Sequence, residues 1–192
     1  MSAIIHALKS SLDNFKGKSM LVALSGGHDS MVLCHALLEL KISFSCAHCN
    51  YRLRGEESDK DAIFIQEFCA HYKIPLHLKI QPINGLETSN IQEKARNIRN
   101  DFFKKIMKDN SYDYLLVAHH AEDRIESFLI NLIRGSGLNG LGTMPAYNQS
   151  IIRPFIHLSK SDLNSFAEER KIQWREDSSN SEDKYVRNIL RH

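Results

Sequence analysis

Short apolar runs alternate along the chain with longer segments that have apolar residues at helical spacing. Runs typical of buried strands cover residues 20–24, 42–49, 76–80 and 114–118, with a fifth strand or its edge at 151–154. Segments of helical periodicity cover residues 4–15, 29–40, 56–72, 88–107, 121–134 and 159–171. This alternation predicts an α/β fold with a parallel sheet of about five strands and helices on both faces. Residues 138–149 follow neither pattern and are expected to form a loop.

Polar residues gather at the ends of three of the predicted strands. The first strand is followed by residues 25–30, the second ends at His48 and Asn50, and the fourth is followed by residues 119–123. In open parallel sheets, ligands bind beyond the carboxyl ends of the strands. We therefore expect these three segments to meet in one crevice.

The segment after the first strand has the composition of a phosphate-binding turn. Its two glycines allow a tight turn that a ligand can approach closely, and the next helix brings unpaired N–H groups to the same place. No lysine follows, which excludes the phosphate loop of ordinary NTPases. The segment resembles the SGGxDS loop of N-type ATP pyrophosphatases, which cleave ATP between the α- and β-phosphates. The expected ATP-binding residues of this loop are Ser25, Gly26, Gly27, His28, Asp29 and Ser30. The alternative is a glycine-rich turn without a ligand.

Composition narrows the class of protein without choosing a function. The 192 residues are 42% hydrophobic and 25% charged, which is ordinary for a globular domain, and the net charge of +2 is too small to argue for nucleic acid. The first fifteen residues lack the apolar core of a signal peptide, and no stretch is long enough to span a bilayer. The four cysteines then favour a reducing cytoplasm over a disulfide framework.

Further motifs follow the loop in a fixed order. Together they resemble tRNA(Ile)-lysidine synthetase, a branch of the PP-loop superfamily of N-type ATP pyrophosphatases, from about residue 20 to the last residue. The segments that carry this resemblance are AHCNYRLRGEES (47–58), QEKARNIR (92–99), AHHAEDRIES (118–127), RGSGLNGL (134–141) and WREDSSN (174–180) with YVRN (185–188). The resemblance implies a Rossmann-like sheet of the adenine nucleotide α-hydrolase type.

The chain departs from the family pattern at a few positions. Tyr51 stands where the family often has a second histidine, Asn100 replaces an aromatic residue, Glu122 replaces an aspartate, and Ser127 replaces a threonine. None of these changes removes the acidic groups on which the expected chemistry depends. Because the family continues into C-terminal tRNA-binding regions, residues 1–192 are expected to be the catalytic domain alone, with 135–192 as a helical extension.

The resemblance implies an ATP-dependent ligase that modifies tRNA. Its substrates would be L-lysine and tRNA(Ile) with a CAU anticodon, and its products lysidine at the wobble cytidine, AMP and pyrophosphate. The C2 oxygen of the cytosine would attack the α-phosphate, and the lysine amine would then displace AMP from C2. The sequence leaves a homodimer open.

The resemblance also implies roles for individual residues. Asp29 would orient Mg²⁺, and His48 and Asn50 would lie near the nucleotide. Asp123 and Glu126, three residues apart on one helix face, would bind the lysine and accept its proton, or else form surface ion pairs. The arginines expected to act on ATP or RNA phosphates, or else to lie on solvated surfaces, are Arg52, Arg54, Arg96, Arg99, Arg187 and Arg191.

Rival interpretations remain at the level of sequence. A tRNA thiolase on the same scaffold would use Cys46 and Cys49, but residues three apart on a strand point to opposite faces, which favours core packing. A zinc enzyme would use residues 119–126, although H-E-x-x-H spacing is absent. A non-catalytic nucleotide or RNA sensor, or a small-molecule amidotransferase, would show no tRNA-dependent turnover.

Overall fold

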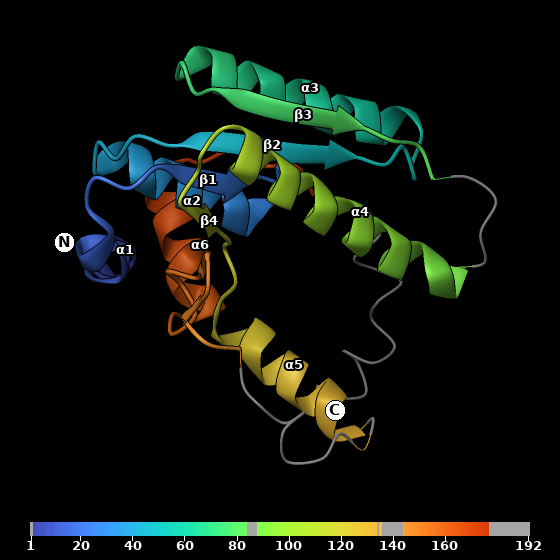
Figure 1. Cartoon of the computed structure of the whole chain (residues 1–192). Coiled ribbons are helices and arrows are strands. Elements are labelled where there is room, and N and C mark those ends of the chain that lie inside the picture. Colours follow the sequence, from blue (N-terminus) through green and yellow to red (C-terminus); the bar gives the residue numbers. More distant parts are fainter. Residues whose placement is uncertain (1, 84–87, 134, 136–143, 177–192) are drawn as a thin grey trace.

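A computed structural model of the chain describes residues 2–83, 88–133, 135 and 144–176 (Figure 1). The described residues form a six-stranded sheet with the strand order β3-β2-β1-β4-β6-β5. The strands are β1 (Met20–Ala23), β2 (Ser45–Asn50), β3 (Leu76–Ile80), β4 (Tyr114–Leu116), β5 (Tyr147–Asn148) and β6 (Ile151–Ile152). All neighbours are parallel except β5 and β6. The α/β prediction is therefore confirmed, with one antiparallel strand added at the edge.

Helices cover both faces of this sheet (Figure 1). The helical elements are α1 (Ala3–Leu12), the short 3-10 turn η1 (Asp13–Phe15), α2 (His28–Glu39), α3 (Glu56–His71), α4 (Thr88–Asp109), α5 (Ala121–Ile133) and α6 (Lys160–Glu169). Side chains of α1, α2, α3 and α6 share one buried core. Phe102 and Phe103 of α4 pack with Leu21 and Leu115 on the opposite face.

Two boundaries differ from the expected ones for physical reasons. Residues 42–44 are not in β2, because the N–H of Ile42 donates to the carbonyl of Leu37 and closes the end of α2. The expected loop at 138–149 contains β5, which pairs with β6 across a turn where Gln149 has a φ of 51°. The described part of 135–192 therefore adds strands to the sheet as well as α6, which packs on α1 and α2.

Helix α5 extends away from the sheet (Figure 1). Ile125, Leu132 and Ile133 are more than half exposed on it. Within the described ranges, no helix combines the length and hydropathy needed to span a bilayer.

The sheet order places the expected site. Strand β1 lies between β2 and β4 and is parallel to both. The carboxyl ends of these three strands are therefore adjacent, and the segments that follow them share one edge of the sheet.

Candidate functional site

The loop between β1 and α2 is held by its own serines. The Ser25 and Ser30 hydroxyls lie 3.0 Å apart, and the Gly27 N–H donates to Ser25 Oγ over 3.2 Å. Ser30 Oγ donates to the Gly27 carbonyl over 3.0 Å. The loop is thus fixed with the amino end of α2 facing outward, which is a favourable place for an anion.

Gly26 allows the turn because its φ is 83°, in the left-handed region. A Cβ atom there would also lie 3.1 Å from Cδ1 of Ile65 in α3. The Gly26 carbonyl accepts a hydrogen bond of 2.9 Å from the N–H of Arg175. Residues far apart in the chain, in α3 and after α6, therefore contact the loop at Gly26.

Asp29, in the first turn of α2, is the centre of the polar network. Its Oδ1 lies 2.8 Å from His28 Nδ1 and accepts a hydrogen bond from the Lys160 ammonium, and its Oδ2 lies 3.4 Å from His120 Nε2. Burial by itself would raise the pKa of this carboxyl, but these donors outweigh it and hold the pKa far below its usual range. Asp29 is therefore a carboxylate with three positive or donating neighbours.

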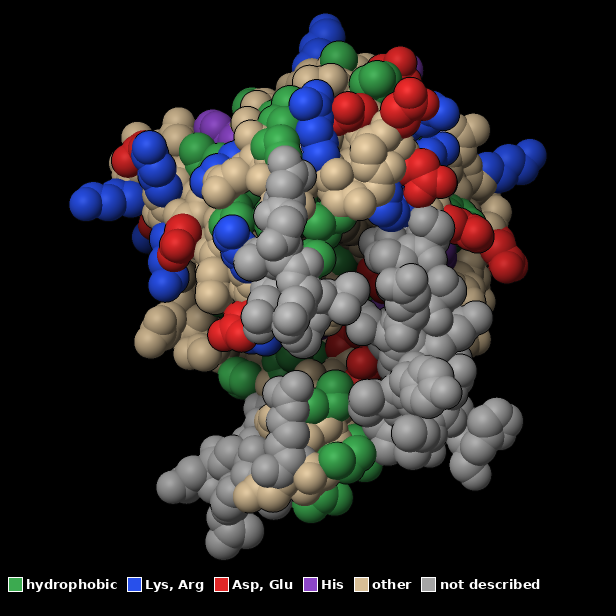
Figure 2. Space-filling model, turned by 90° about the vertical axis from the view of Figure 1, so that its right-hand side faces the viewer, with side chains coloured by type: hydrophobic (Ala, Val, Ile, Leu, Met, Phe, Trp, Pro, Cys, Tyr) green, Lys and Arg blue, Asp and Glu red, His purple; other side chains and the backbone are tan. Residues whose placement is uncertain are grey.

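His120 connects Asp29 to the start of α5. In its ring, Nδ1 lies 2.9 Å from Glu122 Oε2 and Nε2 lies 3.5 Å from Asp123 Oδ2. The backbone N–H of His120 donates to Asp123 Oδ2 over 2.9 Å. Burial would lower the pKa of His120, but contact with Asp29 and the charge of Asp123 raise it. The imidazole thus favours its cationic form beside three carboxylates. Figure 2 looks onto this edge and shows acidic side chains within a recess.

The end of β2 is also tied down. His48 Nδ1 donates to the Leu24 carbonyl over 2.8 Å, and burial lowers the pKa of this histidine. The Asn50 side chain donates to Asp59 over 2.8 Å. Both residues lie at the expected edge, and the neutral His48 ring braces the loop that follows β1.

The two arginines after β2 are paired with carboxylates of α3. Arg52 Nε donates to Asp59 over 3.0 Å, and Arg54 donates to Asp61 over 2.7 Å. Asp61 also accepts from Arg175 over 2.9 Å. These ion pairs were not predicted from the sequence. A phosphate that binds to either arginine would have to compete with its carboxylate partner.

The remaining expected residues are more dispersed. Arg96 and Arg99 are exposed on α4, and the charge of Arg99 contributes, after burial, to lowering the pKa of His119. Glu126 is half-buried on α5, one turn after Asp123. The positions of Arg187 and Arg191 lie outside the described residues.

Two residues of the site were not expected. Lys160 is the first residue of α6, and Trp174 packs edge-on against His28 with ring centroids 4.7 Å apart. The positive end of the dipole at the start of a helix disfavours a lysine. The position of Lys160 therefore indicated an acidic partner elsewhere in the chain. Trp174 opens the WREDSSN motif, but its contact with His28 depends on the long-range path of the chain and was not predicted.

The oxygen donors are compatible with magnesium at Asp29. Asp29 and Asp123 each place one oxygen within 3.5 Å of His120 Nε2, so the site offers two hard ligands and would need phosphate or water for the others. Among the described side chains, no group of three or more His, Cys, Asp or Glu residues is arranged to hold a metal by itself. A metal shared with nucleotide phosphates fits this donor set, provided that Lys160 yields its place on Asp29.

The cysteines pack on two different faces of the sheet. Cys34, Cys46 and Cys69 are buried in one core, whereas Cys49 packs on the opposite face of the sheet. The neighbouring Cys34 thiol and burial raise the pKa of Cys46. The expectation that Cys46 and Cys49 point to opposite faces of the sheet is confirmed, because the two side chains pack against different core clusters.

Comparison with known proteins identifies the family. The PP-loop domain family matches residues 1–192. The chain is a PP-loop domain. Membership supports the use of ATP, in agreement with the expectation from the loop.

This PP-loop domain is similar to curated proteins named tRNA(Ile)-lysidine synthase. It is 40% identical to the Porphyromonas gingivalis protein over 177 residues, which cover 90% of the chain and 39% of that relative. It is 34% identical to the Chlorobaculum tepidum protein over 183 residues, which cover 92% of the chain and 55% of that relative. The chain thus spans only about two fifths to just over half of these relatives.

Solved structures share the fold at low sequence identity. The U34-tRNA thiolase NcsA from Methanococcus maripaludis, which carries a [4Fe-4S] cluster, superposes with a TM-score of 0.74 at 18% identity over 97% of this chain and 70% of that chain. The NH3-dependent NAD synthetase from Campylobacter jejuni gives a TM-score of 0.56 at 15% identity over 98% of this chain and 79% of that chain. At sequence identities this low, the comparison shows a shared fold and nothing more.

Proposed function

We propose that this PP-loop domain catalyses the ATP-dependent ligation of L-lysine to C2 of the wobble cytidine in tRNA(Ile) with a CAU anticodon. The products are lysidine, AMP and pyrophosphate, and the base is adenylated between the two steps. The similarity to lysidine synthases over 90% of the chain supports this reaction. The cytoplasm is the proposed location, and a homodimer remains a prediction.

The arrangement of Asp29 and Asp123 around His120 carries the proposal. One carboxylate belongs to the phosphate loop and the other to α5, and both lie within 3.5 Å of the same imidazole nitrogen. A reaction that joins ATP activation to attack by an amine needs an anion site and a cation site close together. Here the amino end of α2 suits the polyphosphate, and the acidic start of α5 suits the lysine.

Each part has a defined task in the proposed reaction. The N–H groups of the 25–30 loop hold the departing pyrophosphate, and the cationic His120 offsets negative charge that develops on the α-phosphate. Asp123 and Glu126 bind the ammonium of the incoming lysine and take its proton before attack. When bound, Mg²⁺ would be held by Asp29 and phosphate oxygens and would neutralise polyphosphate charge.

The arginines are proposed to bind polyanions. Arg96 and Arg99, exposed on α4, suit RNA phosphates, and Arg187 and Arg191 are proposed to contact the nucleotide. Arg52 and Arg54 would first have to leave Asp59 and Asp61. His48 and Asn50 support the nucleotide side of the crevice.

The test is a turnover assay with the protein, ATP, Mg²⁺, radiolabelled lysine and a tRNA(Ile) transcript with a CAU anticodon. We expect AMP and pyrophosphate in equal amounts and label in the tRNA, all dependent on both lysine and tRNA. A transcript with uridine at the wobble position is the matched control and is expected to remain unlabelled. Turnover without lysine, or sulfur transfer to the tRNA, would contradict the proposal.

A further inference from the structure

Lys160 has an unusual place for a lysine. It is the first residue of α6, where the positive end of the helix dipole disfavours a cation. Its ammonium nevertheless contacts Asp29, which precedes it by 131 residues, and lies 3.2 Å from His28 Nδ1. The long-range partner is what makes this position favourable.

The backbone of Lys160 is fixed, whereas its ammonium has room to move. Its N–H donates to both carboxylate oxygens of Glu122, over 3.0 and 3.1 Å, and Ser159 forms a capping box with Asp162. The Lys160 side chain itself is 39% exposed, and the Asp29 side chain is 28% exposed. A flexible four-carbon stem on a fixed helix end lets the charge move without unfolding any element.

Lys160 and a magnesium ion would compete for the same carboxylate. Asp29 is the only aspartate in the 25–30 loop, and its Oδ1 already accepts the Lys160 hydrogen bond. A polyphosphate bound at the amino end of α2 would offer the ammonium new oxygen partners close to its present one. Binding of metal to Asp29 and movement of Lys160 to phosphate are therefore compatible changes.

We propose that Lys160 is a tethered counter-ion: it neutralises Asp29 in the nucleotide-free loop and transfers to polyphosphate oxygens when magnesium nucleotide binds. The inference rests on the ATP use in the proposed function, but not on tRNA or lysine. Removal of the ammonium then has opposite effects on two ligands. It frees Asp29 for Mg²⁺, and it deprives the polyphosphate of a cation.

Trp174 provides the measurement. It is the only tryptophan in the chain and contacts His28 beside Asp29, so its fluorescence reports on this loop. Wild type and Lys160→Gln are titrated with MgCl₂ alone, and with sodium pyrophosphate at fixed Mg²⁺, at constant ionic strength; calorimetry repeats both titrations. We expect Lys160→Gln to bind Mg²⁺ about fivefold more tightly, a small gain because a partly exposed ion pair is weak. We expect it to bind pyrophosphate about tenfold more weakly, because a charge-assisted contact is lost.

Two variants complete the design. Lys160→Arg keeps the charge, so its affinities for Mg²⁺ and for pyrophosphate are expected to stay close to those of the wild type. If Lys160→Gln does not fold, a large change in either affinity of Lys160→Arg would overturn the proposal. Lys171→Gln removes an exposed lysine from the other end of α6 and should change neither titration. Weakening of both ligands by Lys160→Gln would indicate a merely structural role, and unchanged affinities would overturn the proposal. Failure of lysidine formation alone would contradict the proposed function and leave these titrations intact.

Discussion

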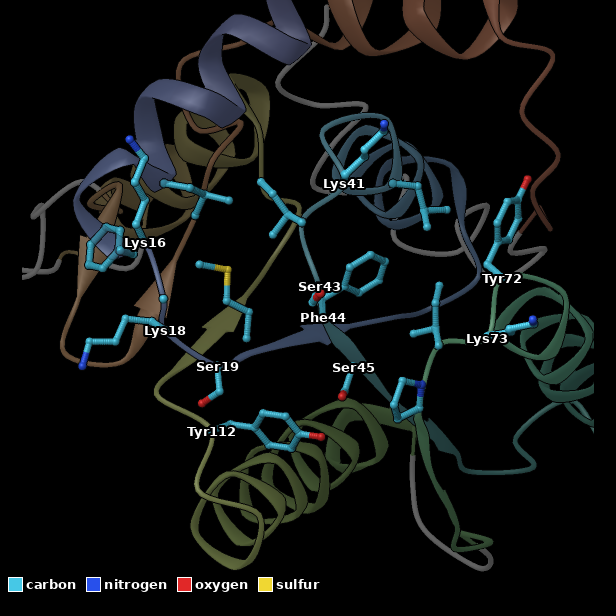
Figure 3. Close-up of a pocket in the computed structure, with 18 residues that line it drawn as sticks. Lys16, Lys18, Ser19, Lys41, Ser43, Phe44, Ser45, Tyr72, Lys73 and Tyr112 are labelled. Carbon is cyan, nitrogen blue, oxygen red and sulfur yellow. The ribbon is translucent and has the colours of Figure 1, made fainter.

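The two edges of the sheet carry similar kinds of charged residue and use them differently. At the carboxyl edge, Asp29, His120 and Lys160 come from three separate elements and contact one another. At the amino edge, a hollow of about 920 Å³ is bordered by Lys16, Lys18, Lys41 and Lys73 (Figure 3). Their ammonium groups point away from one another, so the lysines do not converge on a shared ligand.

Helix geometry explains two of the four lysines of the amino edge, Lys41 and Lys73, and also Lys171, which follows α6. Lys41, Lys73 and Lys171 each follow a helix with φ between 51° and 57°. The next N–H in each case donates back into the last turn, as Ile42 does to Leu37 over 3.0 Å. A cation there complements the negative end of the helix dipole. Two of the rim lysines are thus accounted for by helix termination, whereas the charged groups of the carboxyl edge contact one another across separate elements.

The largest expected effect distinguishes the edges directly. Asp29→Ala is expected to lower pyrophosphate release by about 100- to 1,000-fold, because the variant loses the carboxylate proposed to hold the Mg²⁺ that neutralises polyphosphate charge. Asp113→Ala, at the amino edge, loses hydrogen bonds of 2.8 and 2.9 Å to Ser19 and should retain full turnover. Equal losses of turnover in the two variants would contradict the assignment of the active site to the carboxyl edge. The measurement is a coupled pyrophosphate assay.

Asp123→Ala should separate the two halves of the proposed reaction. It removes an acidic group proposed to bind lysine, so label transfer is expected to fall by about 100-fold, while adenylation of the tRNA, followed as pyrophosphate release in a single turnover, falls less. The variant also loses the hydrogen bond to the His120 N–H. Asp162→Ala loses the equivalent contact of 2.9 Å with the Ser159 N–H and is the control for this helix-capping effect. Equal loss of pyrophosphate release and of lysidine would contradict the assignment of Asp123 to lysine.

Gly26 and Gly17 test the same backbone conformation at opposite ends of β1. Their φ values are 83° and 77°, and alanine in this region costs about 1–2 kcal/mol at either site. Only Gly26 has a neighbour, 3.1 Å from the added Cβ atom. Gly26→Ala should therefore unfold at a lower urea concentration than Gly17→Ala and should bind ATP at least about tenfold more weakly. Loss of ATP binding in Gly17→Ala would count against a loop-specific effect.

The two edges should also respond to opposite changes of pH. Contact with carboxylates raises the pKa of His120, so its contribution to the free energy of unfolding is complete below about pH 6.5 and is lost as the pH rises through the raised pKa. Hydrogen bonds from Ser19 lower the pKa of Asp113, so its contribution is lost only as the pH falls through that lowered value. Urea unfolding from pH 6 to 9 should show a difference between wild type and His120→Asn that shrinks with rising pH. A constant difference would contradict the raised pKa.

The smallest expected effect is at a helix end. Lys41→Gly relieves a left-handed lysine and should raise the free energy of unfolding by up to about 1 kcal/mol, with unchanged turnover. Thermal unfolding and the pyrophosphate assay measure the two quantities. A loss of turnover would mean that the hollow at the amino edge takes part in function.

Local patterns were sufficient to predict most elements and the edge that carries the site. The apolar run before Ser25 predicts β1, because a strand whose side chains are buried on both faces is apolar throughout. Strand β5 was missed because Tyr147 and Asn148 form too short a run. Partners distant in sequence were not predictable. The ion pair of Lys160 with Asp29, and those of Arg52 and Arg54 with α3, depend on which elements the fold brings together.

The separation of 131 residues between Lys160 and Asp29 has a consequence for biosynthesis. A ribosome adds about 5–20 residues per second, so Asp29 is made roughly 7–26 s before its lysine partner. During that interval β1, α2 and β2 can form local contacts, whereas Asp29 lacks its ammonium neighbour. The nascent chain would therefore complete the charge network of its nucleotide loop only after α6 is made, long after the loop itself.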